Sequence, residues 1–224
     1  MGRPRGKGRD KKMDNIDHFY YINLDFRIDR DQHILKNIIY KLGLKEEKYT
    51  RISAVDTTKE KTLGRRSIGC AASHLKIWNL ATKAQEKYIM VIEDDFSFIR
   101  SVEEIKNDIN KLFKYDKDFQ ICNVGYNNIS PLTKVKDTDF LYRCDNIQTT
   151  SCYILNMEFS KKLIPLVEEA IFHLSNGGDP NEYALDQIWK KYQKNNPKWY
   201  LIQRSGIQMA DYSDIEQRFA DYGV

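Results

Sequence analysis

Short apolar runs alternate along this chain with longer segments in which apolar residues recur at helical spacing. Residues 18–24 form a nearly continuous apolar run, which is typical of a strand covered on both faces. Residues 49–55 and 88–92 predict two further strands, and the second of these runs directly into three acidic residues. Later strands are predicted over residues 119–124, 150–155 and 199–203.

The intervening segments predict helices over residues 34–42, 67–81, 101–113, 158–174 and 182–193. Gly43 is placed to end the first helix, and Ser67 is expected to cap the second. Ser101 with Glu104 has the spacing of a capping box. Pro165 lies inside a helical pattern, so a break or kink is expected there.

Strands that alternate with helices indicate an α/β protein with a parallel or mixed sheet. In such sheets ligands gather at the carboxyl ends of the strands. The loops after Leu24, Val55 and Ile92 are therefore the expected place for a site.

Length and composition limit the possible organisation. With 224 residues, of which 41% are hydrophobic, the chain can bury one core, which favours a single domain. No run approaches the roughly 18 apolar residues of a membrane helix. The basic start lacks the apolar stretch of a secretory signal, and the chain does not end in an ER-retention tail. A cytoplasmic protein is expected, in the host cytoplasm if its source is a virus.

The formal net charge of +4 comes from the first residues. Residues 1–12 hold six Lys or Arg against Asp10, so the rest of the chain is close to neutral. A polyanion or membrane contact is one interpretation, and a disordered solubilising extension is the other. The absence of aromatic residues in this segment favours the second and argues against a nucleic-acid partner. We expect a tail over residues 1–15 and one domain over residues 16–224.

The four cysteines show no C-x-x-C spacing and no partnered histidine pattern. Zinc and redox motifs are therefore not supported. Cys122 and Cys152 lie within apolar runs, where a reduced, buried thiol is the ordinary outcome.

The sequence Glu93-Asp94-Asp95 follows a buried apolar strand. Three carboxylates at such a position repel one another and lose hydration, which a bound cation or basic partners can offset. Oxygen ligands suit Mg²⁺ or Mn²⁺. A solvated turn after an edge strand explains the triplet equally well.

A set of segments occurs in a fixed order along the chain: residues 21–30, 51–56, 68–78 with the motif Ile68-Gly-Cys-Ala-Ala-Ser-His74, 90–95, 149–155, 161–163, 185–186, Gln208 and 213–215. Together these segments resemble glycosyltransferase family 25, which includes lipopolysaccharide galactosyltransferases and procollagen-type galactosyltransferases. The similarity covers about residues 18–216. Ser67 stands where the family commonly has an acidic residue.

The resemblance implies a single-domain, Rossmann-like GT-A fold with a mostly parallel, mixed central sheet. It further implies a hexosyltransferase that inverts the anomeric centre and uses a UDP-sugar, with galactose or glucose as the sugar. Mn²⁺ or Mg²⁺ is the implied cofactor. The implied acceptor is a hydroxyl on a glycan or on hydroxylysine of a collagen-like protein, and a homodimer is left open.

The resemblance also implies roles for individual residues. Asp95 and Glu93 are the expected metal ligands, and Asp95 is counted with the catalytic residues. Solvated loop arginines, an Asx-turn at Asp56 and a satisfied core histidine at position 74 are the structural alternatives. The donor side is expected to include Asn23, Arg27, Arg30, Asp56, Ser73, His74, Glu93 and Asp94.

On the acceptor side, Asp186 is expected to act as the base that removes the hydroxyl proton. A carboxylate stabilised at a helix N-terminus without catalysis is the alternative. Gln148 and Tyr153 are expected to contact the acceptor.

Two rival functions remain. A nucleotide-handling enzyme of another family is disfavoured, because the chain has neither a P-loop nor a G-x-G-x-x-G motif. A nucleotide-sugar-binding module that has lost catalysis would keep the same fold.

Overall fold

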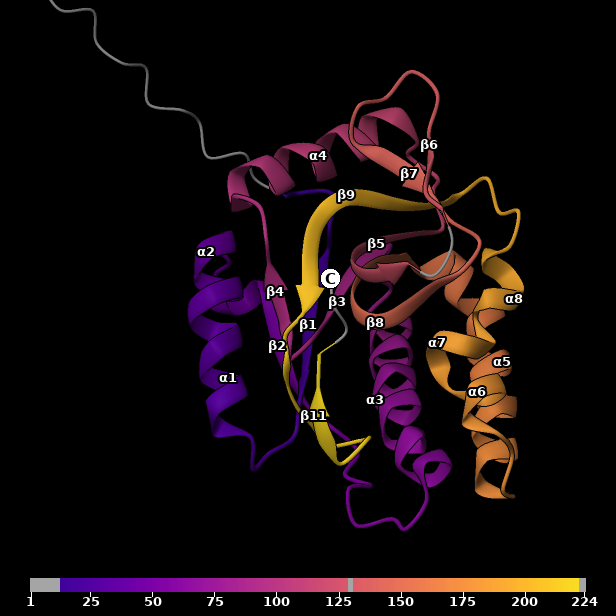
Figure 1. The fold of residues 1–224 in the computed structure, drawn as a ribbon. Helices are drawn as coiled ribbons and strands as arrows, with labels where there is room; N and C mark the ends of the chain where they lie inside the picture. The colour runs from indigo at the N-terminus through magenta and orange to yellow at the C-terminus, as the bar shows by residue number, and fades with distance from the viewer. Residues whose placement is uncertain (1–12, 129–130, 222–224) are drawn as a thin grey trace, which may run out of the picture.

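The computed structural model describes residues 13–128 and 131–221. One mixed sheet separates two layers of helices: α1 and α2 lie on one side, and α3 and α5–α8 lie on the other (Figure 1). Of the expected tail, residues 1–12 lie outside the described part of the chain. Met13 is already buried in the core beside Ile16.

The sheet has the strand order β2-β1-β3-β8-β5-β9-β7-β6, and β4 pairs with β9. β1 pairs in parallel with β2 and β3, and β5 pairs in parallel with β9, whereas β8 runs antiparallel between β3 and β5. The strands are β1 (His18–Asn23), β2 (Tyr49–Ser53), β3 (Tyr88–Glu93), β4 (Phe96–Phe98), β5 (Ile121–Asn128), β6 (Thr133–Lys134), β7 (Leu141–Arg143), β8 (Ile147–Asn156) and β9 (Trp199–Gln208). Most of them share one direction, so the expected α/β class with a mostly parallel, mixed central sheet is confirmed.

A separate two-stranded hairpin follows β9. It is formed by β10 (Asp211–Ser213) and β11 (Arg218–Ala220), which pair antiparallel. We call residues 211–220 the C-terminal hairpin. The pattern along the sequence did not predict it, nor did it predict the short strands β4, β6 and β7.

The helices agree with most of the sequence predictions. The first helical segment runs as α1 (Ile28–Ile34), a π-helical turn η1 (Leu35–Ile39) and α2 (Tyr40–Leu42), and Gly43 ends it at φ 72°. After a 3-10 turn, η2 (Glu46–Lys48), β2 begins. α4 (Val102–Tyr115) has the expected capping box between Ser101 and Glu104.

The predicted cap of the second helix and the predicted single helix over residues 182–193 were wrong. α3 (Leu63–Lys83) begins four residues before Ser67 and is capped by Thr62, while the Ser67 hydroxyl bonds to the Leu63 carbonyl inside the helix. The predicted helix over 182–193 is divided into α6 (Pro180–Tyr183), α7 (Leu185–Ile188) and α8 (Lys190–Gln193). Ala184, with ψ 151°, is extended and interrupts the first two.

α5 (Met157–Ser175) continues through Pro165, so the predicted break is absent from this described helix. Strand alternation divides the core between the two layers. Side chains such as Phe19 and Met90 pack on α1, η1 and α4, and their neighbours such as Tyr20 and Ile89 pack on α3 and α5. Within residues 13–128 and 131–221, no helix is both long and apolar enough to cross a membrane.

Candidate active site

Two cavities meet at the carboxyl ends of the central strands. The arginine cavity, named for Arg30 and Arg66 in its wall, is also lined by Leu24, Val55 and Glu93, from the three loops expected to form a site. The aspartate cavity, named for Asp186, is also lined by Gln148 and Thr149 of β8. The space between atoms at these two positions, including the open solvent at their mouths, is about 680 and 1010 Å³.

The two cavities share part of their walls. Glu93 from the end of β3 and Cys70 from α3 line both. Gln208 from the end of β9 and two residues of the C-terminal hairpin, Ser213 and Ile215, also line both. A ligand in one cavity can therefore reach a ligand in the other beside Glu93.

Asp94 is fixed by partners from the first strand and helix. Its carboxylate accepts hydrogen bonds from Asn23 Nδ2 at 2.8 Å and from Arg30 Nη1 at 3.0 Å. Burial raises the pKa of Asp94, although Arg30 and Asn23 oppose that shift. Arg51 in turn donates to the side-chain oxygen Oδ1 of Asn23, and this contact fixes the orientation of the Asn23 side-chain amide.

Asp95 has one carboxylate oxygen with a partner and one without. Gln208 Nε2 donates to Oδ2 at 2.9 Å, whereas the buried Oδ1 has no hydrogen-bond partner among the described residues. Burial, with the neighbouring charges of Glu93 and Asp94, raises the pKa of Asp95 to about 7. A buried carboxylate oxygen without a donor is the kind of group that a hard divalent cation stabilises. The residues present therefore fit Mn²⁺ or Mg²⁺ at Asp95.

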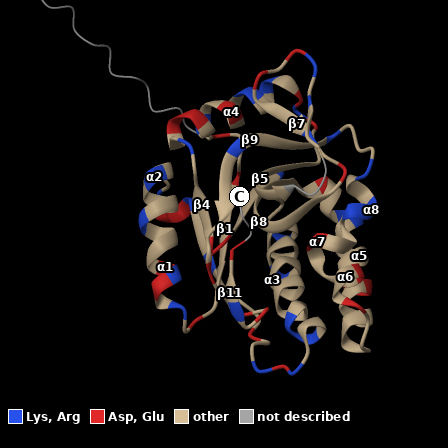
Figure 2. Cartoon of the chain, in the orientation of Figure 1, with Lys and Arg blue, Asp and Glu red and all other residues tan. Residues whose placement is uncertain are grey.

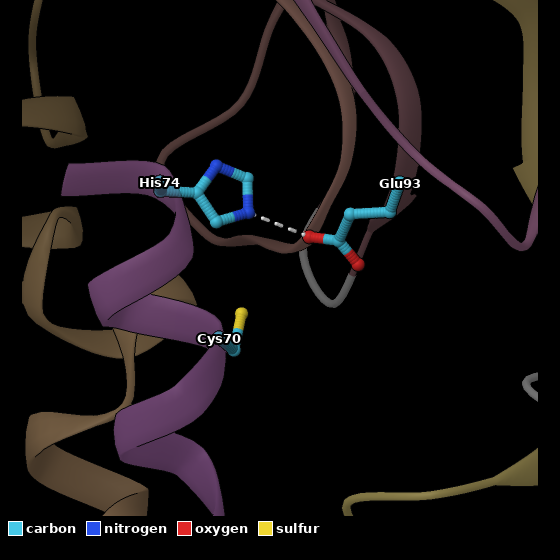
Figure 3. A group of neighbouring side chains, drawn as sticks. All are labelled: Cys70, His74 and Glu93. Carbon is cyan, nitrogen blue, oxygen red and sulfur yellow. Dashed lines mark hydrogen bonds and ion pairs between the residues drawn. The ribbon is translucent and has the colours of Figure 1, made fainter. Parts of the chain in front are cut away.

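Glu93 is oriented by the neighbouring helix and by β8. His74 Nε2 lies 3.0 Å from Oε1 (Figure 3). Thr150 Oγ1 donates to the same oxygen. Burial opposes ionisation of Glu93, but the hydrogen bonds that it accepts from His74 and Thr150 lower its pKa on balance. Because Oε1 already has two partners, Oε2 is the oxygen of Glu93 that could join Asp95 in holding a cation.

Tyr153, which is itself hydrogen-bonded to Trp78, orients the ring of His74. His74 Nδ1 lies 2.8 Å from the hydroxyl oxygen of Tyr153, which accepts a hydrogen bond from Trp78 Nε1 at 3.0 Å. Because the Glu93 carboxylate can only accept, Nε2 of the neutral imidazole carries the proton and donates it to Glu93, and Nδ1 accepts from the Tyr153 hydroxyl. His74 is thus a fully buried histidine with both nitrogens satisfied that also lines the arginine cavity.

Asp186 lies in the first turn of α7, in the wall of the aspartate cavity. Its carboxylate accepts from the backbone N–H of Thr149 at 3.2 Å, and burial raises its pKa. A raised pKa favours a carboxylate that takes up a proton near neutral pH.

The C-terminal hairpin covers the arginines that follow β1. Asp211 accepts from both Arg27 Nη2 at 2.8 Å and Arg30 Nε at 3.1 Å, and Asp214 accepts from Arg27 Nη1 at 2.6 Å. Arg66 is bonded through Nε to the Ile215 carbonyl of the same segment. Charges of both signs are interspersed along α1 and α4, the pattern of solvated helix faces (Figure 2).

Three predicted site residues lie away from the cavity walls. Asp56 caps its own turn by accepting from Thr58, as the Asx-turn alternative required, and Arg27 is occupied by carboxylates. Tyr153 is fully buried and lines neither cavity, so the expected direct contact with an acceptor is corrected to a contact with His74. The cavity walls do contain Asn23, Arg30, Ser73, His74, Glu93, Asp94 and Asp95 on one side, and Gln148 and Asp186 on the other.

The sequence interpretation missed Arg66 and Thr150. Arg66 lies just before the Ile-Gly-Cys motif, and this position was the available signal. Thr150 belongs to the segment 149–155 that resembles the family, but nothing in the sequence singles it out as a residue of the site. Gln208 and residues 213–215 had been noted only as parts of the resemblance.

The sequence matches the family described as glycosyltransferase family 25 (LPS biosynthesis protein) over residues 43–189. A curated relative from Drosophila pseudoobscura pseudoobscura, a glycosyltransferase 25 family member, is 22% identical over 189 residues. The alignment covers 72% of this chain and 29% of the relative, so this chain spans less than a third of that protein's length.

Two solved structures are similar in fold. A glycosyltransferase involved in the glycosylation of the major capsid of PBCV-1 has a TM-score of 0.49 and 8% identity, covering 89% of this chain and 96% of that one. A mannose-1-phosphate geranyltransferase from Thermus thermophilus has a TM-score of 0.45 and 11% identity, covering 93% and 76%.

Proposed function

Because this chain belongs to glycosyltransferase family 25, we propose that it is an inverting, metal-assisted hexosyltransferase. Its donor in this proposal is a UDP-sugar, with galactose or glucose as the sugar. Its acceptor is a hydroxyl group on a glycan or on hydroxylysine of a collagen-like protein.

The observation that carries this proposal is the meeting of two cavities beside Glu93. The arginine cavity has a carboxylate oxygen, Asp95 Oδ1, without a partner among the described residues, and the aspartate cavity has the half-buried carboxylate of Asp186. Transfer of a sugar requires the donor and the acceptor to contact each other at the reacting atoms. Two neighbouring cavities that share lining residues beside Glu93 can bring a donor and an acceptor together in this way.

The arginine cavity is assigned to the donor. Arg30 and Arg66 supply positive charge for a diphosphate, and guanidinium groups bind phosphate oxygens in pairs. Asp95, with Glu93, would hold the divalent cation. When bound, such a cation neutralises the charge that develops on the departing nucleotide diphosphate.

The aspartate cavity is assigned to the acceptor. In an inverting reaction the acceptor oxygen attacks the anomeric carbon from the face opposite the nucleotide, and the carbon–oxygen bond to the diphosphate breaks. Asp186 takes the proton that the hydroxyl loses, a role that its raised pKa favours. Gln148 in the same wall can donate to an acceptor hydroxyl.

One observation favours a second candidate, a module that binds nucleotide sugars without catalysis. Asp211 and Asp214 already neutralise Arg27, and Asp211 also contacts Arg30. In that case the ion pairs with the C-terminal hairpin would persist and no sugar would be transferred. Donor hydrolysis separates the two candidates.

The test compares UDP-sugar binding and turnover in Mn²⁺ and in EDTA, for the wild type and two variants. Asp95→Asn is expected to lose metal-enhanced binding and about 100-fold or more in turnover, because it removes an ionic group where leaving-group charge develops. Asp186→Asn is expected to keep donor binding and to lose transfer to the acceptor.

Asp56→Asn is the matched control, since this exposed aspartate lines neither cavity, and it is expected to behave as the wild type. Affinity that is unchanged by chelation would remove the metal from the proposal. Wild-type transfer by Asp186→Asn would require another base. Binding without turnover in the wild type, with acceptors of both classes present, would favour the non-catalytic module.

A further inference from the structure

We propose that Cys70, His74 and Glu93 form a separate site for a soft divalent cation such as Zn²⁺. This site shares Glu93 with the oxygen-only position at Asp95, but its other two ligands come from α3. It does not depend on the proposed transferase activity, because its ligands and its test concern cation binding alone.

The fold brings these three side chains to one point. Cys70 and His74 are four residues apart on α3 and therefore project from one face of the helix, one turn apart. Glu93 ends β3 opposite this face. One ligand atom from each residue lies within 4.8 Å of the other two, and Figure 3 shows the thiol, the imidazole and the carboxylate around a common space.

The chemistry of the donor set selects the cation. Thiolate, imidazole and carboxylate are the usual ligands of Zn²⁺, while Mn²⁺ and Mg²⁺ prefer oxygen. Bonds of about 2.0–2.3 Å in a tetrahedral zinc site separate the ligand atoms by roughly 3.5 Å. His74 and Glu93 are already closer than this, at 3.0 Å, so small rotations of the three side chains suffice.

The surroundings also favour a cation. Cys70 is half-buried, and loss of solvent around its thiol, together with the negative charges of Glu93, Asp186 and Asp95, raises its pKa. The same negative surroundings attract a divalent cation, which reverses the effect and stabilises the thiolate. Binding therefore releases the thiol proton to solvent, one for each cation bound.

Tyr153 and Trp78 provide an orienting layer behind the imidazole. Without metal, Nε2 carries the proton and donates to Glu93. With metal at Nε2, the proton moves to Nδ1 and is donated to the Tyr153 oxygen, which remains the acceptor for Trp78. The tyrosine hydroxyl hydrogen then loses its acceptor, a cost that the metal–ligand bonds must exceed.

Cys70 and Glu93 line both cavities, so a cation between them occupies the common wall. It would also take Glu93 away from its contacts with Thr150. Zn²⁺ at this position is therefore expected to oppose any reaction that joins ligands of the two cavities.

The probe is Cd²⁺, followed by Zn²⁺, added to the metal-free chain. Cadmium bound to a thiolate gives an ultraviolet charge-transfer absorption, and calorimetry gives affinity and proton release for zinc. The wild type is expected to bind one equivalent with the charge-transfer band and to release one proton. Cys70→Ser is expected to lose the band and to weaken Zn²⁺ binding by about 100-fold or more.

Cys144→Ser is the matched control, because Cys144 lies in another buried cluster and outside both cavity walls. Thermal unfolding of each metal-free variant establishes that it is folded. Asp95→Asn is expected to keep the band. Equal Zn²⁺ affinity in folded Cys70→Ser and wild type would overturn the proposal, as would loss of zinc binding in Asp95→Asn but not in Cys70→Ser.

Discussion

Arg27 Nη1 lies 2.6 Å from Asp214 Oδ2, and this ion pair joins two segments 187 residues apart in the sequence. Arg27 follows β1, whereas Asp214 belongs to the C-terminal hairpin that lines the arginine cavity. The wall of that cavity therefore depends on a contact between the beginning and the end of the described domain.

Replacement of Arg27 by glutamine is expected to reduce the free energy of unfolding by roughly 1–3 kcal/mol, because charged hydrogen bonds are lost and Asp214 keeps a partly buried charge. UDP-sugar affinity should fall as well, since the hairpin loses its contacts with Arg27 through Asp211 and Asp214. Denaturant unfolding and donor titration measure both effects. Arg65→Gln is the control, because the Arg65 side chain bonds to the Ser175 carbonyl at the end of α5. Equal losses in the two variants would show that the hairpin contact is unimportant.

The stability of the metal-free protein should depend on pH through Asp95. Its pKa is raised from 3.8 to about 7, so between these values the folded state binds more protons than the unfolded state. The contribution of Asp95 to stability is therefore present below about pH 4 and is lost as the pH rises toward 7.

Asp95→Asn removes the pH-dependent contribution of Asp95 to the free energy of unfolding. The variant should therefore gain stability relative to the wild type as the pH rises from 4 to 7. Asp94 and Asp186 also have raised pKa values, but both proteins retain them and their contributions cancel to first order. Melting temperatures of the two proteins across this range provide the measurement. A constant difference between them would contradict the assignment.

Gly206 is expected to tolerate no side chain. A Cβ atom there would lie 2.2 Å from the ring of Phe96, which is fully buried beside β9. Gly206→Ala should therefore cost about 1–3 kcal/mol or more. Gly64→Ala is a control of opposite sign, because its Cβ would meet neighbours only at 3.4 Å and beyond, and alanine is favoured within α3. Stability of Gly206→Ala equal to wild type would mean that Phe96 can move aside.

Removal of residues 1–12 is expected to leave donor turnover unchanged, because the residues assigned to the site begin at Asn23. Turnover of the truncated and full-length proteins, both shown to be folded by circular dichroism, is the comparison. Loss of hydrolysis in a folded truncated protein would place the basic segment in the site.

The sequence predicted the strand that ends at Glu93 and the loops that line the arginine cavity, because these features follow from local apolar patterns and the general rule for strand ends. It did not predict that Tyr153 faces the core. Adjacent residues of β8 point to opposite layers, and Tyr153 packs toward α3 while Cys152 packs toward the other layer. The position of Tyr153 along β8, odd or even, therefore decides which of the two helix layers its side chain faces.

The contacts between Arg27, Arg30 and the C-terminal hairpin could not be predicted, because no local pattern links residues so far apart. The same holds for Cys70, His74 and Glu93. The first two have a recognisable helical spacing, but only the packing of α3 against the end of β3 adds the third ligand.

The pairing of Arg27 with the hairpin has a consequence during synthesis. A ribosome that adds about 5–20 residues per second completes β1 roughly 10–40 s before Asp211 and Asp214 emerge. Throughout that interval the nascent chain carries Arg27 and Arg30 without the hairpin carboxylates of Asp211 and Asp214, and it lacks β9, an interior strand of the sheet. A translation product that stops before β9 contains the acidic triplet and α3 but lacks Gln208 and the hairpin residues that line both cavities. The walls of both cavities are therefore completed only when the last part of this domain is made.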